Sequence, residues 1–183
     1  MSRYDRSSDP DLPKYLRKSV IDRLLENAYK ERKRDYLIML TMFRTGMRVS
    51  EITNLEKQDI DFDNLQIMVR DGKGGKDRVI PLEKELGNQL GFYSDDMKGS
   101  DQLFALSERM VQKIVKKYVP EDIDESRVTP HKFRHSFGVY TIRKGMNLRT
   151  LQKILGHSDL STTEVYLDLA GEDVKEDFEK VEW

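Results

Sequence analysis

Hydrophobic positions near the start of the chain recur every three or four residues, as they do on one side of an α-helix. The first such segment follows Ser19, whose hydroxyl is suited to cap the first turn. We therefore predict a helix that begins after this serine. Its apolar positions, which we expect to face the core, are Val20, Leu24, Leu25 and Ala28.

The same spacing continues in a second helix, predicted from Lys33 to Thr45. Gly46 follows at once, and glycine is the residue that most often ends a helix. A short third helix is predicted directly afterwards, over residues 49–55. The apolar positions of the second helix are Tyr36, Leu37, Leu40 and Phe43.

The spacing then changes from helical to alternating, which is typical of half-buried strands. A glycine-rich segment, residues 71–77, separates the last two of these strands and predicts the tip of a hairpin. We therefore expect a small antiparallel sheet. The alternating apolar positions are Ile60, Phe62, Ile67, Val69 and Val79.

Helical patterns return in the second half of the chain. Thr129 and Pro130 are a favourable cap and first residue for one helix, and Gly156 ends another. The predicted helices cover residues 83–92, 107–118, 129–144 and 148–155. Beyond them, residues 161–164 have the form of a capping box, and Val174, Phe178 and Val181 mark a short acidic amphipathic helix.

These elements predict one domain that is mainly α with a small antiparallel β-sheet, over residues 14–183. Residues 1–13 are rich in Ser, Asp, Arg and Pro and lack an apolar period, so we expect a linker or a disordered N-terminus there.

Composition narrows the classes of protein that remain. The chain has 183 residues, 37% hydrophobic and 36% charged, which is enough apolar material for one core. No run approaches the roughly 18 apolar residues of a membrane span, so no membrane partner is expected. The absence of cysteine excludes disulfides, thiolate metal sites and a cysteine nucleophile, and it agrees with a reducing cytoplasm.

The formal net charge of −1 hides a sorted distribution. Residues 1–50 carry 12 basic and 7 acidic side chains, and residues 109–153 carry 11 and 4. The remaining two blocks, residues 51–108 and 154–183, are acidic, with 7 basic against 13 acidic and 2 against 9. A fold that gathers the basic blocks on one face would attract a phosphate backbone, although solvated helix faces explain charge runs equally well.

All three histidines fall in one part of the chain. His131, Arg134 and His135 are spaced to share one face of the helix that follows Thr129, and His157 comes directly after a helix-ending glycine. Two histidines four residues apart suit zinc, but the cations between them and the lack of a further ligand disfavour a metal site. The alternative for this face is an exposed polar surface.

Five short segments, in this order, together form a recognisable signature. Arg48 stands just after a helix-ending glycine, where an arginine beside a helix N-terminus favours an anion. Lys73 lies on the glycine-rich hairpin tip, and Tyr166 lies on a predicted capped helix. The segments are Thr45–Glu51, Gly72–Arg78, His131–His135, Leu155–His157 and Tyr166. From about Pro13 to Tyr166, the chain resembles the catalytic domain of the tyrosine recombinases, which include Xer-type recombinases and phage or archaeal integrases.

This resemblance implies a site-specific DNA recombinase in which Tyr166 attacks a DNA phosphodiester, leaving a 3′-phosphotyrosine and a free 5′-hydroxyl. Arg48, Arg134 and His157 would then bind the phosphate oxygens, and His131 would accept the proton of the tyrosine. Lys73 would protonate the departing 5′-oxygen. Rejoining would need neither ATP nor a metal, and no cofactor is expected.

Three further residues receive supporting roles from the same resemblance. Glu51 is expected to orient the first arginine, and His135 is expected to be structural rather than catalytic. Lys76 competes with Lys73 for the role of general acid. Two other functions stay open: a type IB topoisomerase-like enzyme that relaxes DNA, and a non-catalytic DNA-binding remnant.

The resemblance also suggests partners. Double-stranded DNA is the expected substrate, with a homo-oligomer, a tetrameric synapse, assembled on it and a monomer when free. Relatives usually carry an N-terminal core-binding domain, which is expected to be absent from this chain. The expected location is the cytoplasm, in association with the nucleoid.

Overall fold

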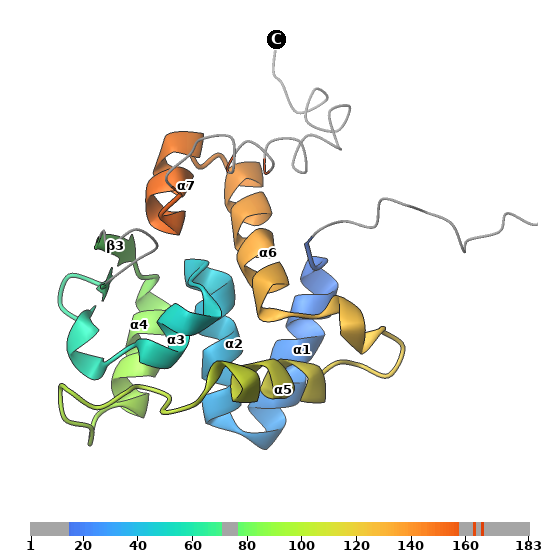
Figure 1. Cartoon of the computed structure of the whole chain (residues 1–183), viewed down its shortest axis with the longest axis horizontal. Coiled ribbons are helices and arrows are strands. Elements are labelled where there is room, and N and C mark those ends of the chain that lie inside the picture. The colour runs from blue at the N-terminus through green and yellow to red at the C-terminus, as the bar shows by residue number, and fades with distance from the viewer. Residues whose placement is uncertain (1–14, 71–76, 158–162, 164–165, 167–183) are drawn as a thin grey trace, which may run out of the picture.

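Two long helices, α2 (Lys33–Thr45) and α6 (Pro130–Arg143), pack against each other at the centre of the molecule (Figure 1). The structure is a computed structural model that describes residues 15–70, 77–157, 163 and 166. The other helices and the sheet surround this central pair. Their bounds are α1 Lys18–Glu31, α3 Val49–Asn54, α4 Lys84–Tyr93, α5 Glu108–Lys117 and α7 Leu148–Leu155, with 3-10 turns at Lys57–Asp59 and Glu125–Arg127.

Helix α2 is buried on nearly all sides because its sequence is almost continuously apolar from Leu37 to Phe43. Its only hydroxyl within that run, on Thr41, donates to the carbonyl of Leu37 and so needs no other partner. Helix α1 packs beside α2 through Ile21, Leu24 and Ala28. The first two predicted helices are therefore confirmed, and Gly46 ends α2 with φ +65°.

The predicted cap of α1 was wrong. The helix begins at Lys18 with Arg17 as its cap, so Ser19 lies in the first turn and caps nothing. The chain before the helix is held by α6. The backbone N–H of Leu16 donates to Ser136 Oγ at 2.8 Å, and the carbonyl of Leu16 accepts from Tyr140 Oη at 3.1 Å. These contacts with α6 decide where α1 begins, and they are invisible to a local sequence pattern.

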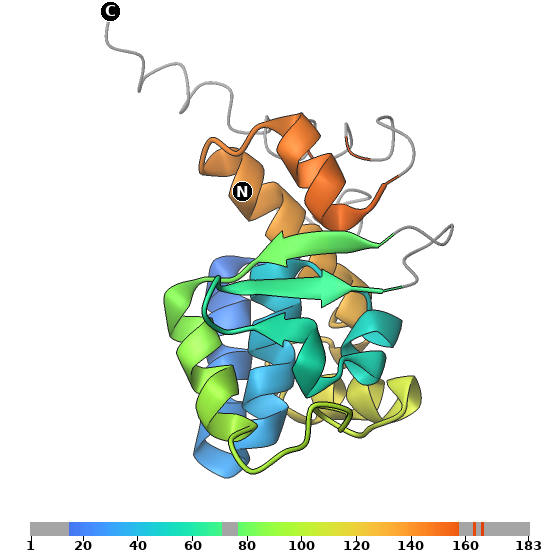
Figure 2. The same cartoon turned by 90° about the vertical axis from the view of Figure 1, so that its left-hand side faces the viewer.

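The sheet has three antiparallel strands in the order β1 (Ile60–Asp61), β2 (Gln66–Val69) and β3 (Arg78–Pro81), seen in Figure 2. Helix α7 packs on β3. Ile67 pairs with Ile80, and both side chains are buried. The prediction that Val79 faces the core was wrong, because Val79 is 43% exposed and its neighbours in the strand point inward instead.

The later helices begin and end close to where the sequence predicts. Thr129 Oγ1 accepts from the backbone N–H of Lys132 at 3.3 Å, with Pro130 as the first residue of α6. Gly156 ends α7 with φ +65°. The helix predicted over residues 107–118 is α5, and Ser107 is its cap, because its side chain accepts from the N–H of Met110. The predicted fold class, mainly α with a small antiparallel β-sheet, is thus confirmed.

Several predictions lie outside the described residues. They are the linker at residues 1–13, the glycine-rich hairpin tip apart from Asp77, the capping box at 161–164 apart from Thr163, and the acidic helix with Val174, Phe178 and Val181. Within the described part of the chain, none of the helices has the length and apolar character needed to span a bilayer.

Candidate active site

Arg134 lies at the centre of the predicted site, on the face of α6 that meets the ends of α2 and α7. Its side chain is almost fully buried, and its Nη1 and Nη2 donate to the carbonyls of Gly46 and Leu155, each at 2.7 Å. Both carbonyls stand at helix C-termini, where unpaired C=O groups carry partial negative charge and stabilise a buried cation. Burial, and then the charge of Arg48, lower the pKa of Arg134 to about 10, so the guanidinium stays charged at neutral pH.

His157 is placed beside this guanidinium by the left-handed turn at Gly156. Its Nε2 lies 3.0 Å from Arg134 Nη2, and its Nδ1 lies 3.0 Å from Thr163 Oγ1. Because a guanidinium only donates, Nε2 accepts, and the ring proton sits on Nδ1 and points to the threonine. Burial, followed by the charges of Arg134 and Arg48, lowers the pKa of His157 to about 4. The resting imidazole is therefore neutral at pH 7.

Arg48 and Glu51 form a reciprocal pair at the start of α3. The backbone N–H of Arg48 donates to Glu51 Oε2 at 2.7 Å, and its Nη1 donates to Oε1 at 2.9 Å. The carboxylate is buried and the guanidinium is partly exposed. This contact fixes the direction of the Arg48 side chain from the first turn of the helix.

The phenol ring of Tyr166 packs directly on α6. The side chain is 2% exposed, and a Cβ added at Gly138 would lie 2.6 Å from its Cε1. The ring is stacked on His157 with centroids 6.3 Å apart. Burial raises the pKa of Tyr166, and the charges of Arg134 and Arg48 oppose that rise, so both arginines act on this phenol.

His131 and His135 contact each other on the outer end of the same cluster. Their Nε2 atoms are 2.7 Å apart, and the ring of His135 lies 5.5 Å from that of Tyr166, centroid to centroid. One imidazole must donate and the other accept in this hydrogen bond. Burial, then the charges of Arg134 and Arg48, lower the pKa of His131. Among the described residues, no group of three His, Cys, Asp or Glu side chains is arranged to hold a metal ion.

Contacts or electrostatic coupling therefore link all the sequence-predicted residues that the structure describes. These are Arg48, Glu51, His131, Arg134, His135, His157 and Tyr166. Lys73 and Lys76, the two candidates for the general acid, lie outside the described residues.

Sequence reasoning missed two residues of this cluster. Arg78, on β3, makes a bidentate ion pair with Glu51. The sequence did indicate that the Arg78 side chain faces inward, because Arg78 and Ile80 are two residues apart and so share the buried face of the strand. Thr163, the partner of the His157 ring, carried no such signal: in the sequence it reads as part of a capping box.

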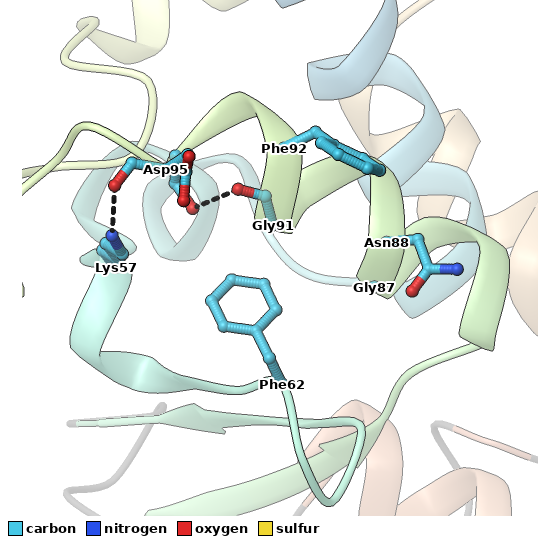
Figure 3. A pocket seen from close by; sticks show the side chains of 8 residues that line it. Lys57, Phe62, Gly87, Asn88, Gly91, Phe92 and Asp95 are labelled. Atoms are coloured by element: carbon cyan, nitrogen blue, oxygen red, sulfur yellow. Dashed lines mark hydrogen bonds between the residues drawn. The ribbon is translucent and has the colours of Figure 1, made fainter.

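A separate pocket of about 460 Å³ lies between α4 and the start of the sheet (Figure 3). Phe62 points toward it, Phe92 is among its lining residues, and Lys57 Nζ donates to the carbonyl of Asp95 at its edge. None of the predicted site residues lines this pocket. The pocket is therefore separate from the cluster of arginines and histidines that α3, α6 and α7 position.

Comparison with known proteins places this cluster in context. The sequence profile of the phage integrase family matches residues 14–172. The tyrosine recombinase XerA of Thermococcus kodakarensis is 38% identical over 179 residues, which cover 92% of this chain and 63% of that protein. The chain thus spans a little less than two thirds of that relative.

Solved structures agree with the sequence comparison. The crystal structure of a XerA recombinase superposes with a TM-score of 0.78 at 30% identity, covering 95% of this chain and 68% of that one. The XerH site-specific recombinase bound to its difH substrate, in a pre-cleavage complex, superposes with a TM-score of 0.70 at 26% identity, covering 85% and 50%.

Proposed function

Because the chain belongs to the phage integrase family, we propose that it is the catalytic part of a site-specific DNA recombinase of the tyrosine class. One observation carries this proposal: two guanidiniums, an imidazole and a phenol converge on the same face of α6. Arg134 contacts His157, the His157 ring is stacked on Tyr166, and the charge of Arg48 acts on that phenol. A phosphodiester bound there would meet its nucleophile and its cations together.

The proposed step is an exchange of one phosphoester for another. The phenol oxygen of Tyr166 attacks the phosphorus, an O–P bond forms, and the bond from phosphorus to the 5′-oxygen breaks. The products are a 3′-phosphotyrosine and a free 5′-hydroxyl. Since one phosphoester replaces another, a 5′-hydroxyl can reverse the step on the same or another strand without ATP.

Two protons move during this exchange. We assign the proton of Tyr166 to His131, whose lowered pKa keeps it neutral and able to accept. The contact between His131 and His135 supports a fixed orientation of the accepting ring. We assign the proton delivered to the 5′-oxygen to Lys73, with Lys76 as the competing donor.

The transition state gathers negative charge on the non-bridging oxygens, and preorganised cations stabilise that charge. Arg48 and Arg134 would each donate two hydrogen bonds to the phosphate, as guanidinium geometry allows. Phosphate entry would also raise the pKa of His157, because a nearby anion favours the protonated ring. His157 protonated at Nε2 can no longer accept from Arg134, so it would exchange that contact for the phosphate and become a third donor.

The substrate follows from the same argument. Double-stranded DNA is the proposed partner, supported by the likeness to a recombinase bound to its DNA substrate. We further propose that the chain is monomeric when free and assembles as a tetramer on paired sites, acting on nucleoid DNA in the cytoplasm. Residues 14–183 would form the catalytic domain and residues 1–13 a linker to it.

A covalent complex with DNA tests this function. The chain is incubated with nicked suicide duplexes whose sequences are first selected from a random library by binding to it. We expect a protein–DNA band that resists denaturation in the wild type and is lost in Tyr166→Phe.

Tyr29→Phe is the matched control, because Tyr29 is 67% exposed on α1, and its band should remain. A band of wild-type strength in Tyr166→Phe would remove the nucleophile assignment. Relaxation of supercoiled DNA without strand exchange between two sites would point to a topoisomerase-like enzyme instead.

A further inference from the structure

Arg78 is a buried cation that the proposed chemistry does not use. It is the first residue of β3, and the alternation of the strand turns its side chain inward with Ile80. The Arg78 side chain is only 8% exposed. A buried guanidinium is unfavourable unless its donors are paired, so its partners explain its presence.

Those partners come from two other elements. Nη1 and Nη2 of Arg78 donate to the two oxygens of Glu51, each at 2.8 Å, as a bidentate fork. Its Nε donates to the carbonyl of Ile154 at 2.7 Å, in the last turn of α7. One planar group therefore ties β3 to α3 and α7. Arg48 is the residue just before α3, and His157 lies two residues beyond the end of α7.

The carboxylate of Glu51 lies between two arginines. The oxygens that accept from Arg78 also accept from the backbone and Nη1 of Arg48. Burial alone would raise the pKa of Glu51, but the hydrogen bonds from Arg78 and Arg48 outweigh it and hold the pKa below its usual value. Glu51 is therefore ionised, and it orients Arg48 as an anion.

An anion beside a phosphate site is costly unless it is neutralised. With Glu51 and Arg48 alone, the two charges would cancel, and a carboxylate would stand close to the incoming phosphate. Arg78 changes this balance, because the three side chains together carry one net positive charge. The guanidinium of Arg48 then stays oriented while the group as a whole still attracts an anion.

Arg78 also lies against the turn that carries His157. A Cβ added at Gly156 would lie 3.0 Å from Arg78 Cδ and 3.2 Å from its Nε. Gly156 has φ +65° as well, so glycine suits this position both in backbone conformation and in space. The stem of Arg78 thus supports the turn at the residue next to the catalytic histidine.

We propose that Arg78 is a positioning residue of the recombinase site. It holds Glu51, and through it Arg48, it supports the turn before His157, and it neutralises the carboxylate that would otherwise repel the phosphate. This inference rests on the proposed function for the identity of the anion.

The test is a charge-compensation series: Arg78→Met, Glu51→Gln and the double variant. Arg78→Met lowers the net charge of the group from +1 to 0, and the double variant restores +1 while the glutamine oxygen still accepts from Arg48. We expect Arg78→Met to slow covalent-complex formation about 10²-fold, as misplaced catalytic groups do. The double variant should recover at least about tenfold over Arg78→Met, which corresponds to ~1.4 kcal/mol.

Binding is measured in parallel in a Tyr166→Phe background, where no covalent step intervenes. The dissociation constant for a short selected duplex should rise in Arg78→Met and fall again in the double variant. Arg78→Lys keeps the charge without the fork and should bind DNA nearly as well as the wild type while cleaving more slowly. If Arg78→Met does not fold, Arg78→Lys still tests the role of Arg78, because it retains the positive charge and removes only the forked hydrogen bonds.

Arg23→Met is the matched control, since Arg23 makes a bidentate pair with Asp122 on the exposed side of α1. It should change neither binding nor cleavage. Wild-type binding and cleavage in Arg78→Met, or a double variant no better than Arg78→Met, would overturn the role of Arg78. A wild type that never forms a covalent complex, with the binding series intact, would instead overturn the proposed catalysis.

Discussion

At the scale of single residues, the site is built from cations held by backbone carbonyls rather than by carboxylates alone. Arg134 is bound by the C-terminal carbonyls of α2 and α7, so its charge is not cancelled by an acid. Arg48 is oriented by an acid, and Arg78 shares that acid. Both arrangements leave a net positive charge where the proposed phosphate would bind.

The lowered pKa of His157 predicts a pH dependence of stability. A folded-state pKa of about 4, below the ordinary value of about 6.5, means that the unfolded chain takes up the proton first as pH falls. The stability contributed by the neutral ring is therefore complete above pH ~6.5 and is lost as pH falls through ~4. Histidine ring resonances followed by NMR should show this low titration directly.

Urea unfolding gives the matching stability test. Between pH ~6.5 and ~4, the free energy of unfolding should fall more steeply in the wild type than in His157→Gln, in which this group no longer titrates. Carboxylates titrate in both proteins and cancel in the comparison. Parallel pH profiles, or a His157 resonance that titrates near its ordinary value, would contradict the buried geometry.

At the scale of elements, glycines at helix ends determine how closely the helices pack and where the site residues lie. Gly46 ends α2 with φ +65°, and a Cβ there would lie 2.4 Å from Phe137 Cδ1 on α6. The Gly46 carbonyl also accepts from Arg134. The close packing of α2 on α6 and the placement of the central cation thus depend on one residue without a side chain.

We expect Gly46→Ala to destabilise the protein strongly. Gly145→Ala is the matched control, because Gly145 also has a positive φ but nothing within 4 Å of its added Cβ. Both changes carry the left-handed cost of ~1–2 kcal/mol, and overlap with Phe137 adds ~1–3 kcal/mol at Gly46 alone. Equal losses in urea unfolding would show that the helices relax without cost.

Local patterns predicted most elements but not their three-dimensional neighbours. Helix α6 followed from Thr129 and Pro130, and α7 from its stop at Gly156, because caps and turns are local chemistry. The start of α1 was wrong because contacts between Leu16 and α6 decide it. The inward face of β3 was misassigned because the burial of Arg78 depends on Glu51, which lies 27 residues away.

At the scale of the whole molecule, the fold brings the two basic blocks of the sequence together. Helices α1 and α2 come from the first block, and α5 and α6 from the second, and α2 packs against the other three (Figure 1). The cluster of arginines and histidines lies where these blocks meet the ends of α3 and α7. The net charge of −1 therefore says little about the face that holds the site.

This distribution predicts salt-dependent binding to DNA despite the slightly negative net charge. Counterion release depends on how many phosphates are neutralised locally, and three or four contacts give a loss of about 10²-fold in affinity between 50 and 200 mM salt. Fluorescence anisotropy with a short duplex in the Tyr166→Phe background measures it. Replacing Arg48 with Met should reduce the slope of log affinity against log salt concentration by the amount that corresponds to about one phosphate contact. Arg23→Met, on the exposed side of α1, should leave this slope unchanged. An affinity that does not vary with salt would mean that the basic helices do not face the phosphate backbone, and the substrate assignment would then be wrong.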